Sequence, residues 1–292
     1  MNQRNKAVVI DHLQKKFGLI WKNTALDDIS MEVEEGKCVA IVGHNGAGKT
    51  TLMKIISGII EKYEGHVITS SRCGFCSENP INFDFMNAKR NLKYYYGGNN
   101  FDDDFNNIFH QLNLESNIHV SGFSKGMKRK LDIARVILSG NKILLLDEPF
   151  DGLDPMVSRE LISLIKRLKN EGNTLIISTH QLEKLDEIAD DFYFFQNGKI
   201  LRVMKADEMA RIFVIKIRNL EINLETKNNS SYKLININEG KFVVKLNEGN
   251  TENDLIKEIM NKGGNIEYFS RISLNDLYLA INEDGDSIRK HT

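Results

Sequence analysis

Residues Gly43–Thr50 read GHNGAGKT and fit the pattern G-x-x-x-x-G-K-[ST] at every fixed position. Glycines in such a loop let backbone N–H groups approach phosphate oxygens with no Cβ in the way. Lys49 can then reach the β- and γ-phosphates, and the Thr50 hydroxyl can bind Mg²⁺. The alternative is a glycine-rich turn that matches by accident, which ordinary glycine usage produces in roughly one chain in a hundred of this length. The spacing therefore predicts a site for a nucleoside triphosphate.

Two acidic residues, Asp147 and Glu148, directly follow the unbroken apolar run Ile143–Leu146. At the carboxyl end of a parallel strand, carboxylates face the ligand crevice. There Asp147 would complete a Mg²⁺ site opposite Thr50, and Glu148 would polarise an attacking water. Two solvated acids at a strand end are the alternative, which the phosphate loop in the same chain makes the weaker interpretation.

Two further candidates are His180 and Ser124. His180 follows the apolar run Leu175–Thr179 and could donate a hydrogen bond to a γ-phosphate oxygen, although a lone histidine there is more often a surface residue. Ser124 stands where a helix N-cap belongs, so the first-turn amides beyond it form an anion site. The four basic residues of Lys125–Lys130 form a solvated face, a patch for an acidic partner or an enrichment of the phosphate environment.

The elements that must position these residues predict an α/β fold. Cys38–Val42 is apolar and precedes the phosphate loop, as a buried strand would. Continuous apolar runs such as Ile143–Leu146 suit interior strands of a parallel sheet that is covered on both faces. After the loop, four apolar residues have the spacing of one helix face: Leu52, Ile55, Ile56 and Ile59.

The bulk composition leaves room for one large domain and one small one in 292 residues. The formal net charge of −1 gives the chain as a whole no electrostatic footprint for nucleic acid. No apolar run approaches the ~20 residues that cross a membrane, and the N-terminus lacks a signal-peptide core. We therefore expect a cytosolic protein whose role at a membrane needs a partner chain. Cys73–Cys76 spells C-x-x-C, but without a second such pair a core strand is favoured over a zinc or redox site.

These motifs in this order resemble the ATP-binding subunit of an ABC transporter over residues 7–205. Gly43–Thr51 matches the Walker A motif, Ile143–Glu148 the Walker B motif, and Asp151–Asp154 the D-loop. His180 is similar to the switch histidine, and Phe17 to the aromatic residue that stacks on adenine, with Trp21 a weaker candidate. The resemblance implies a P-loop ATPase of ABC type that uses ATP and Mg²⁺.

The resemblance also implies a set of site residues. Catalysis falls to Glu148 and His180, and Mg²⁺ binding to Thr50, Asp147 and Glu78. The nucleotide contacts it implies within one subunit are Phe17, Gly43, Asn45, Gly46, Gly48, Lys49, Thr50 and Thr51. Ser124 and Gly126 would reach the same ATP from a second subunit, which makes a homodimer, or a pair with a paralogous ATPase subunit, that shares composite sites.

Two positions depart from the common family pattern. Glu78 stands where the Q-loop glutamine usually lies, and the signature segment Phe123–Met127 has Lys125 for its first glycine and Met127 for its glutamine. This variant, and the tail Ile272–Leu279, look like exporters of the ABC-2 class. The resemblance then implies export of an amphipathic peptide, bacteriocin or drug through a separate permease, with the ATPase on the inner face of the cell membrane. A cytosolic ABC ATPase without a permease and a nucleotide sensor without turnover are the alternatives.

The predicted domain boundary lies at residue 205. Residues 1–205 form the ATPase domain, with a helical subdomain at about 84–140, and 206–292 form a small α+β accessory domain. In the accessory part, Phe213–Ile217 and Phe242–Leu246 should be strands, and two capping boxes should open helices. The boxes are Thr251 with Asp254 and Ser273 with Asp276; a turn at 228–231 and a frayed end at 284–292 complete the prediction. The aromatic residues of 83–96 are either core packing or a groove for a short permease helix.

Overall fold

The computed structural model describes residues 5–18, 23–79, 81–96, 99–114, 118–218, 232–238, 240–261 and 263–283. The chain divides into two compact units. The first unit comprises Met1–His180 and Glu187–Val203, and the second comprises Gln181–Asp186 and Met204–Thr292. Trp21, the turn predicted at 228–231 and the end predicted to fray at 284–292 lie outside the described residues.

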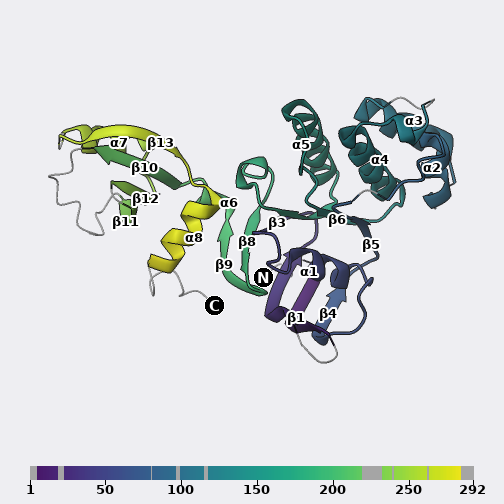
Figure 1. Cartoon of the computed structure of the whole chain (residues 1–292), viewed down its shortest axis with the longest axis horizontal. Helices are drawn as coiled ribbons and strands as arrows, with labels where there is room; N and C mark the ends of the chain where they lie inside the picture. Colours follow the sequence, from purple (N-terminus) through teal and green to yellow (C-terminus); the bar gives the residue numbers. More distant parts are fainter. Residues whose placement is uncertain are drawn as a thin grey trace. The chain divides into compact units, whose positions relative to one another are not determined.

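A six-stranded sheet in the order β5-β6-β7-β3-β8-β9 forms the centre of the first unit (Figure 1). The strand pairs β5–β6, β6–β7, β7–β3 and β3–β8 are parallel. Every residue of β3, β6 and β7 is buried, as predicted for apolar runs between two covered faces. The bounds are β3 Cys38–Gly43, β5 Cys73–Cys76, β6 Ile143–Asp147, β7 Thr174–Thr179, β8 Asp191–Gln196 and β9 Lys199–Lys205.

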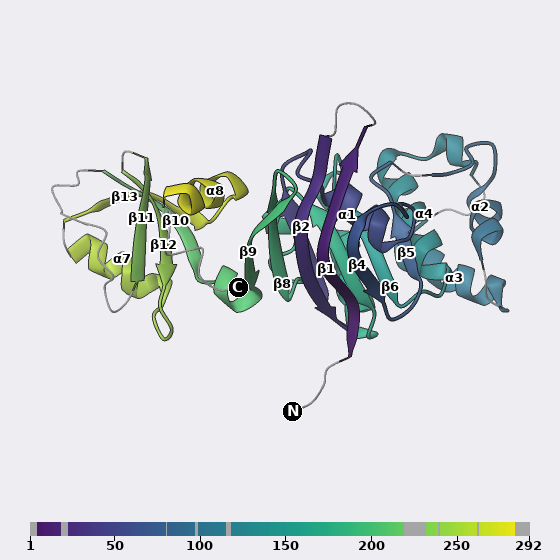
Figure 2. The same cartoon turned by 90° about the horizontal axis from the view of Figure 1, so that it is seen from below.

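A second, antiparallel sheet in the order β2-β1-β4 belongs to the same unit (Figure 2). It comprises β1 Lys6–Phe17, β2 Asn23–Glu34 and β4 Glu64–Thr69. Helix α1, Lys49–Ile56, contacts strands of both sheets, and their apolar side chains share one core with it. The phosphate-loop segment is thereby fixed between two sheets.

Helix α1 is shorter than predicted. Leu52, Ile55 and Ile56 are buried on one helix face, but Ile59 lies beyond the helix end and is exposed. The chain turns at Gly58, whose φ of +78° is left-handed, and the N–H of Ile59 bonds back to the carbonyl of Lys54 at 2.9 Å. Such a left-handed residue ends helices by satisfying their last carbonyls. The spacing of the four apolar residues therefore overestimated the length of the helix.

The helices between β5 and β6 gather beside the sheet (Figure 1) and form the expected helical region. They are α2 Ala88–Tyr95, α3 Phe101–Leu112 and α4 Lys125–Leu138, with a 3₁₀ turn at Val120–Gly122. Buried side chains of α3, such as Phe105 and Phe109, face this group of helices. Helix α5, Pro155–Asn170, follows β6, and a 3₁₀ turn at Leu182–Lys184 follows β7.

The second unit is an α+β fold built on a four-stranded antiparallel sheet in the order β11-β12-β10-β13. The strands predicted at Phe213–Ile217 and Phe242–Leu246 lie within β10 and β12 and are confirmed. Both capping boxes form: Asp254 N–H bonds Thr251 Oγ1 at 3.3 Å, and Asp276 N–H bonds Ser273 Oγ at 3.2 Å. The elements are α6 Ala206–Met209, β10 Ile212–Arg218, β11 Tyr232–Asn238, β12 Lys241–Leu246, α7 Glu252–Asn261, β13 Asn265–Arg271 and α8 Leu274–Glu283.

Candidate functional site

The loop between β3 and α1 borders a cavity of about 340 Å³. The structure brings six of the residues predicted to contact the nucleotide to its lining, together with Glu78 and Glu148, the acidic residues that follow β5 and β6. These residues are Asn45, Gly46, Gly48, Lys49, Thr50, Thr51, Glu78 and Glu148. Gly43 ends β3 directly before the loop. The predicted phosphate-loop contacts, Glu78 and Glu148 therefore converge on one place, whereas Asp147 and His180 do not belong to the lining.

Strand β2 and the hairpin between β8 and β9 hold the loop in shape. Gly48 has a left-handed φ of +105°, and a Cβ on it would lie 2.5 Å from the carbonyl oxygen of Ala25 on β2. In the hairpin between β8 and β9, the N–H of Gly198 donates to the carbonyl of Ala47 at 3.0 Å. The carbonyl of Gly198 in turn accepts from the N–H of Asp27 at 2.8 Å. Only a residue without a side chain fits at position 48.

Replacing Gly48 by alanine should lower the free energy of unfolding by about 2–4 kcal/mol, from the left-handed backbone and the clash with Ala25. Gly46→Ala is the matched control, because Gly46 also has a left-handed φ, of +81°, but its Cβ would meet open space. That variant should lose only about 1–2 kcal/mol. Urea titrations of both variants measure the difference, and equal losses would contradict the role assigned to the contact with Ala25.

The Lys49 ammonium is buried and surrounded by oxygen atoms. Its Nζ donates to the carbonyls of Gly43 at 2.6 Å and His44 at 3.2 Å, and lies 3.0 Å from Glu148 Oε1. Glu148 Oε1 accepts no hydrogen bond of good geometry, so its contact with Lys49 is an ion pair. Because the ammonium has three N–H donors, a phosphate can bind to it only by replacing one of these oxygen atoms.

Asp147 and Glu148 are held by Ser178 on β7. Ser178 Oγ donates to Asp147 Oδ1 at 2.5 Å and accepts the N–H of Glu148 at 2.9 Å. Asp147 is fully buried, yet among the residues that the structure describes its Oδ2 has no hydrogen-bond partner. An unpaired buried carboxylate oxygen is costly unless a cation occupies it. Hard oxygen ligands of this kind suit Mg²⁺, so Asp147 fits the predicted metal.

Glu148 connects the cavity to His180. Glu148 Oε2 lies 2.9 Å from His180 Nδ1, and the backbone of Glu148 is left-handed with φ of +45°. A left-handed residue other than glycine costs about 1–2 kcal/mol, and such strain concentrates at functional sites. The strained backbone points one carboxylate at both Lys49 and His180.

Several predicted site residues lie outside the cavity lining. Ser124 caps α4, accepting the N–H of Met127 at 3.2 Å, and Gly126 packs against Val157 of α5. Phe17 ends β1 with 42% of its surface exposed and Lys15 Nζ 4.7 Å from its ring centroid. None of these residues contributes to the described lining, so their predicted contacts with a nucleotide are not formed by the cavity itself.

Comparisons with known proteins assign the family. A family model described as ABC transporter matches residues 26–151. An uncharacterized ABC transporter ATP-binding protein of Methanocaldococcus jannaschii is 35% identical over 211 residues, covering 70% of this chain and 79% of that protein. The lantibiotic transport ATP-binding protein SrtF of Streptococcus pyogenes is 35% identical over 206 residues, covering 66% and 88%. The chain belongs to the ABC transporter ATP-binding proteins.

Solved structures agree with this family in fold. An ATP-binding subunit of an ABC transporter has a TM-score of 0.62 and 25% identity, covering 70% of this chain and 92% of its own. A dimeric ATP-binding cassette in a post-hydrolysis state with ADP and Pi has a TM-score of 0.63 and 22% identity, covering 68% and 98%. The predicted fold class is confirmed: an ABC-type P-loop domain with a helical region and an extra C-terminal antiparallel sheet. The protein is an ABC ATPase, which binds and hydrolyses ATP.

Part of the site of this ABC ATPase lies outside the predicted motifs. Asn23, Thr24 and Ala25, at the start of β2, line the cavity. Their residue types carry no recognisable chemistry, and they reach the site because Gly48 and Gly198 let two other backbones approach Ala25 closely.

Within the described residues, no helix of this ABC ATPase has the length and apolar character needed to span a membrane.

Proposed function

We propose that this ABC ATPase powers export of a substrate through a separate membrane permease, from the inner face of the cell membrane. The observation that carries the catalytic part is the single carboxylate, Glu148, that contacts both Lys49 and His180 at one cavity. Export is supported by relatives: SrtF is named for lantibiotic transport, and the tail Ile272–Leu279 resembles ABC-2 exporters. An amphipathic peptide, a bacteriocin or a drug is the substrate class we favour.

In the mechanism we propose, Lys49 leaves Glu148 and binds the β- and γ-phosphates of ATP. Thr50, Asp147 and Glu78 would hold Mg²⁺, which neutralises charge on the phosphates when bound. Glu148 accepts a proton from the water that attacks the γ-phosphorus, and the bond to the ADP oxygen breaks. His180 holds Glu148 through Nδ1 and contacts the γ-phosphate.

The exposed aromatic side chains of the helical region support coupling to a permease rather than a free-standing ATPase. Phe85 is 70% exposed and Tyr94 is 71% exposed. The ring of Phe85 is tilted against the half-buried ring of Phe83, and the ring of Tyr94 contacts the same ring edge to face. Phe85 and Tyr94 therefore present apolar surface to a partner. We propose that a short permease helix binds there.

Two copies of the chain should share each ATP. Ser124 and Gly126 lie outside the lining of their own cavity, although the resemblance implies that they bind nucleotide. We propose that they complete the site of a second copy, with Phe17 stacking on the adenine of its own site. A relative of the same fold is described as a dimer with ADP and Pi. In a C₂ dimer the same patch then serves both sites.

Mixing two inactive variants tests this sharing. Ser124→Arg blocks the site of the other copy, and Lys49→Ala disables its own. Half of randomly mixed dimers contain one intact site, so phosphate release should recover to roughly a quarter of the unmodified activity. Heterodimers are verified by co-purification through two different tags. Verified heterodimers without any activity would refute the shared site.

We propose residues 206–292 as an accessory domain that sets dimer stability or the response to the permease. All residues that line the nucleotide cavity precede Lys205. A chain ending at Lys205 should therefore bind ATP with unchanged affinity but form fewer ATP-dependent dimers, as measured by titration calorimetry and light scattering. Weakened ATP binding in a folded truncated protein would show that the division at 205 is wrong.

A further inference from the structure

Helix α4 carries four charged side chains that are buried or largely buried, and three of them share one set of partners. Arg129 is 1% exposed, Asp132 is 0% exposed, and the Arg135 side chain is 18% exposed. Removing an ion from water costs several kcal/mol, so buried charges persist only where they have close partners. The basic run of α4 is thus not a uniform solvated face, and none of its side chains lines the described nucleotide cavity.

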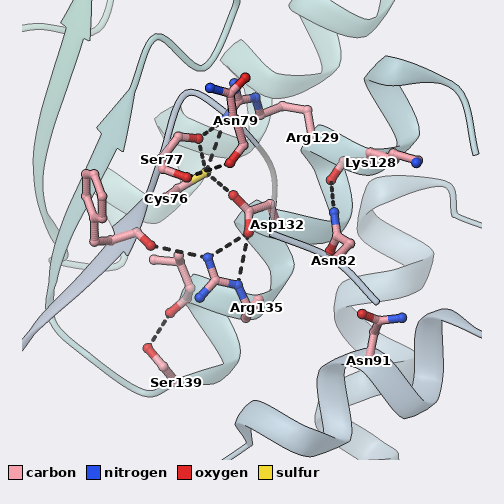
Figure 3. A network of polar contacts seen from close by, with 12 residues as sticks. Cys76, Ser77, Asn79, Asn82, Asn91, Lys128, Arg129, Asp132, Arg135 and Ser139 are labelled. Atoms are coloured by element: carbon pink, nitrogen blue, oxygen red, sulfur yellow. Dashed lines mark hydrogen bonds and ion pairs between the residues drawn. The ribbon is translucent and has the colours of Figure 1, made fainter. Parts of the chain in front are cut away.

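The partners of these charges are the four consecutive residues 75–78, which end β5 and follow it. Figure 3 shows two of them, Cys76 and Ser77, beside the charged side chains of α4. Arg129 Nη1 donates to the carbonyl of Ser77 at 2.6 Å, and its Nη2 donates to the carbonyl of Glu78. Asp132 Oδ2 accepts from Cys76 Sγ at 3.0 Å. A separate contact joins Arg135 Nη2 to the carbonyl of Phe75 at 3.3 Å.

Asp132 also joins the two arginines into one network. Its Oδ1 lies 2.6 Å from Arg135 Nη2 and 2.9 Å from Arg135 Nε. Arg129 Nη1 lies 3.5 Å from Cys76 Sγ, the group that donates to Asp132. The planar fork of a guanidinium can bond two successive carbonyls at once, which a lysine ammonium cannot reproduce in geometry. Ser77 and Glu78 lie beyond the end of β5, outside the strand pairing that the structure describes for it.

Two functional groups thus lie on one rigid helix. Ser124 caps the start of α4, and Arg129 is five residues further along, a rise of about 7.5 Å. Glu78, whose backbone Arg129 holds, lines the nucleotide cavity of the same chain. A shift of the signature end of α4 therefore moves the anchor of Glu78 as well.

We propose that Arg129, braced by Asp132, is a positioning residue that sets Glu78 at the nucleotide site and ties it to the signature end of α4. The inference rests on the proposed role of Glu78 as a Mg²⁺ ligand. Arg129 thereby links two residues of one chain that serve different composite sites. Ser124 serves the site of the second copy, and Glu78 serves the site of its own chain. Occupation of one site is thereby communicated to the second.

Lys130 provides a matched control on the same helix. It is a similarly buried cation, but its Nζ donates to the carbonyl of Leu112 at 3.0 Å and pairs with Glu160. It therefore braces α3 and α5 and leaves the segment before Glu78 untouched. Lys130→Met and Arg129→Met should both lower the melting temperature, and only Arg129→Met should affect the nucleotide site.

The first readout is the Mg²⁺ concentration that half-saturates ATP hydrolysis by the full chain. We expect Arg129→Met to raise it about tenfold, Arg129→Lys to raise it less, and Lys130→Met to leave it unchanged. In a Glu78→Ala background, which itself raises this concentration, Arg129→Met should add no further change. The proposal would be overturned if the two substitutions raised this Mg²⁺ concentration independently, so that their factors multiply. It would also be overturned if Lys130→Met raised it as much as Arg129→Met does.

The second readout does not depend on activity or on Mg²⁺. The Cys76 side chain is fully buried, so a reagent cannot reach its thiol while the segment is held in place. In a Cys73→Ser background, a maleimide should label Cys76 at least ten times faster in Arg129→Met than in Lys130→Met, with mass spectrometry assigning the site. If Cys76 stays equally protected, Arg129 does not hold this segment, and the inference fails.

The two readouts separate the inference from the proposed function. Should Glu78→Ala leave the Mg²⁺ dependence unchanged, the role of Glu78 is wrong, whereas faster labelling of Cys76 would still establish Arg129 as the anchor of the segment. Should Arg129→Met fail to fold, Asp132→Asn and Arg129→Lys test the same contacts. For these variants, unchanged Mg²⁺ dependence and unchanged labelling together would refute the proposal.

Discussion

Replacing Glu148 by glutamine should slow ATP turnover by a factor of about 10²–10⁴, the usual contribution of a general base. Glutamine keeps the size of the side chain and can still contact His180, but it cannot accept a proton from water. It also releases Lys49 from its ion pair, so ATP should bind at least as well as before. Phosphate release and nucleotide titration measure the two effects separately.

The same variant should accumulate as an ATP-bound dimer, because hydrolysis no longer separates the two copies. Light scattering with and without ATP detects this species. The matched control is Glu187→Gln, since Glu187 is an exposed acid of the same unit that pairs with Lys166 in a surface contact. Turnover within about threefold of the unmodified protein in Glu148→Gln would remove Glu148 from the role of base.

Lys49→Ala should weaken ATP binding by about 10²-fold or more, since each hydrogen bond to a charged group contributes about 1.5–3 kcal/mol. It should also lower the free energy of unfolding by about 3–5 kcal/mol, because Glu148 remains buried without its cation. Calorimetric titration and urea unfolding measure these losses. Lys54→Ala, on the same helix, should change neither.

The double variant Lys49→Ala with Glu148→Gln separates the two roles of Lys49. A neutral glutamine needs no counterion, so much of the lost stability should return. The affinity for ATP should stay low, because the phosphates still lack their cation. If the double variant is as unstable as Lys49→Ala, the Lys49–Glu148 ion pair does not contribute to stability as its geometry implies.

The features that the sequence predicted correctly are those defined by local spacing. The phosphate loop, the interior strand β6 and the capping box of Thr251 and Asp254 each depend on residues within a few positions of one another. A continuous apolar run or an i, i+3 pair has the same meaning in any protein, because backbone geometry alone sets it. The fold class followed from these elements and from the order of the motifs.

The features that the sequence did not predict arise from contacts between distant segments. The early end of α1 depends on a left-handed turn at Gly58, and the approach of Ala25 to the cavity depends on Gly48 and Gly198. The different contacts of Arg129 and Lys130 could not be predicted either. Adjacent side chains on a helix point about 100° apart, and only the surrounding elements determine the partners of each. Residue type gave no guide, because both are cations.

The hairpin contact at Gly198 affects when the phosphate loop can fold during protein synthesis. Chains fold as they emerge, N-terminal segments first, and the phosphate loop emerges long before the hairpin that donates to Ala47. Until Gly198 arrives, the loop lacks the partner that closes it against β2. A ligand stabilises only the species that binds it. We therefore expect ATP to stabilise the complete ATPase unit but not a partly synthesised chain that lacks Gly198. Such a chain depends on its own hydrophobic core for stability.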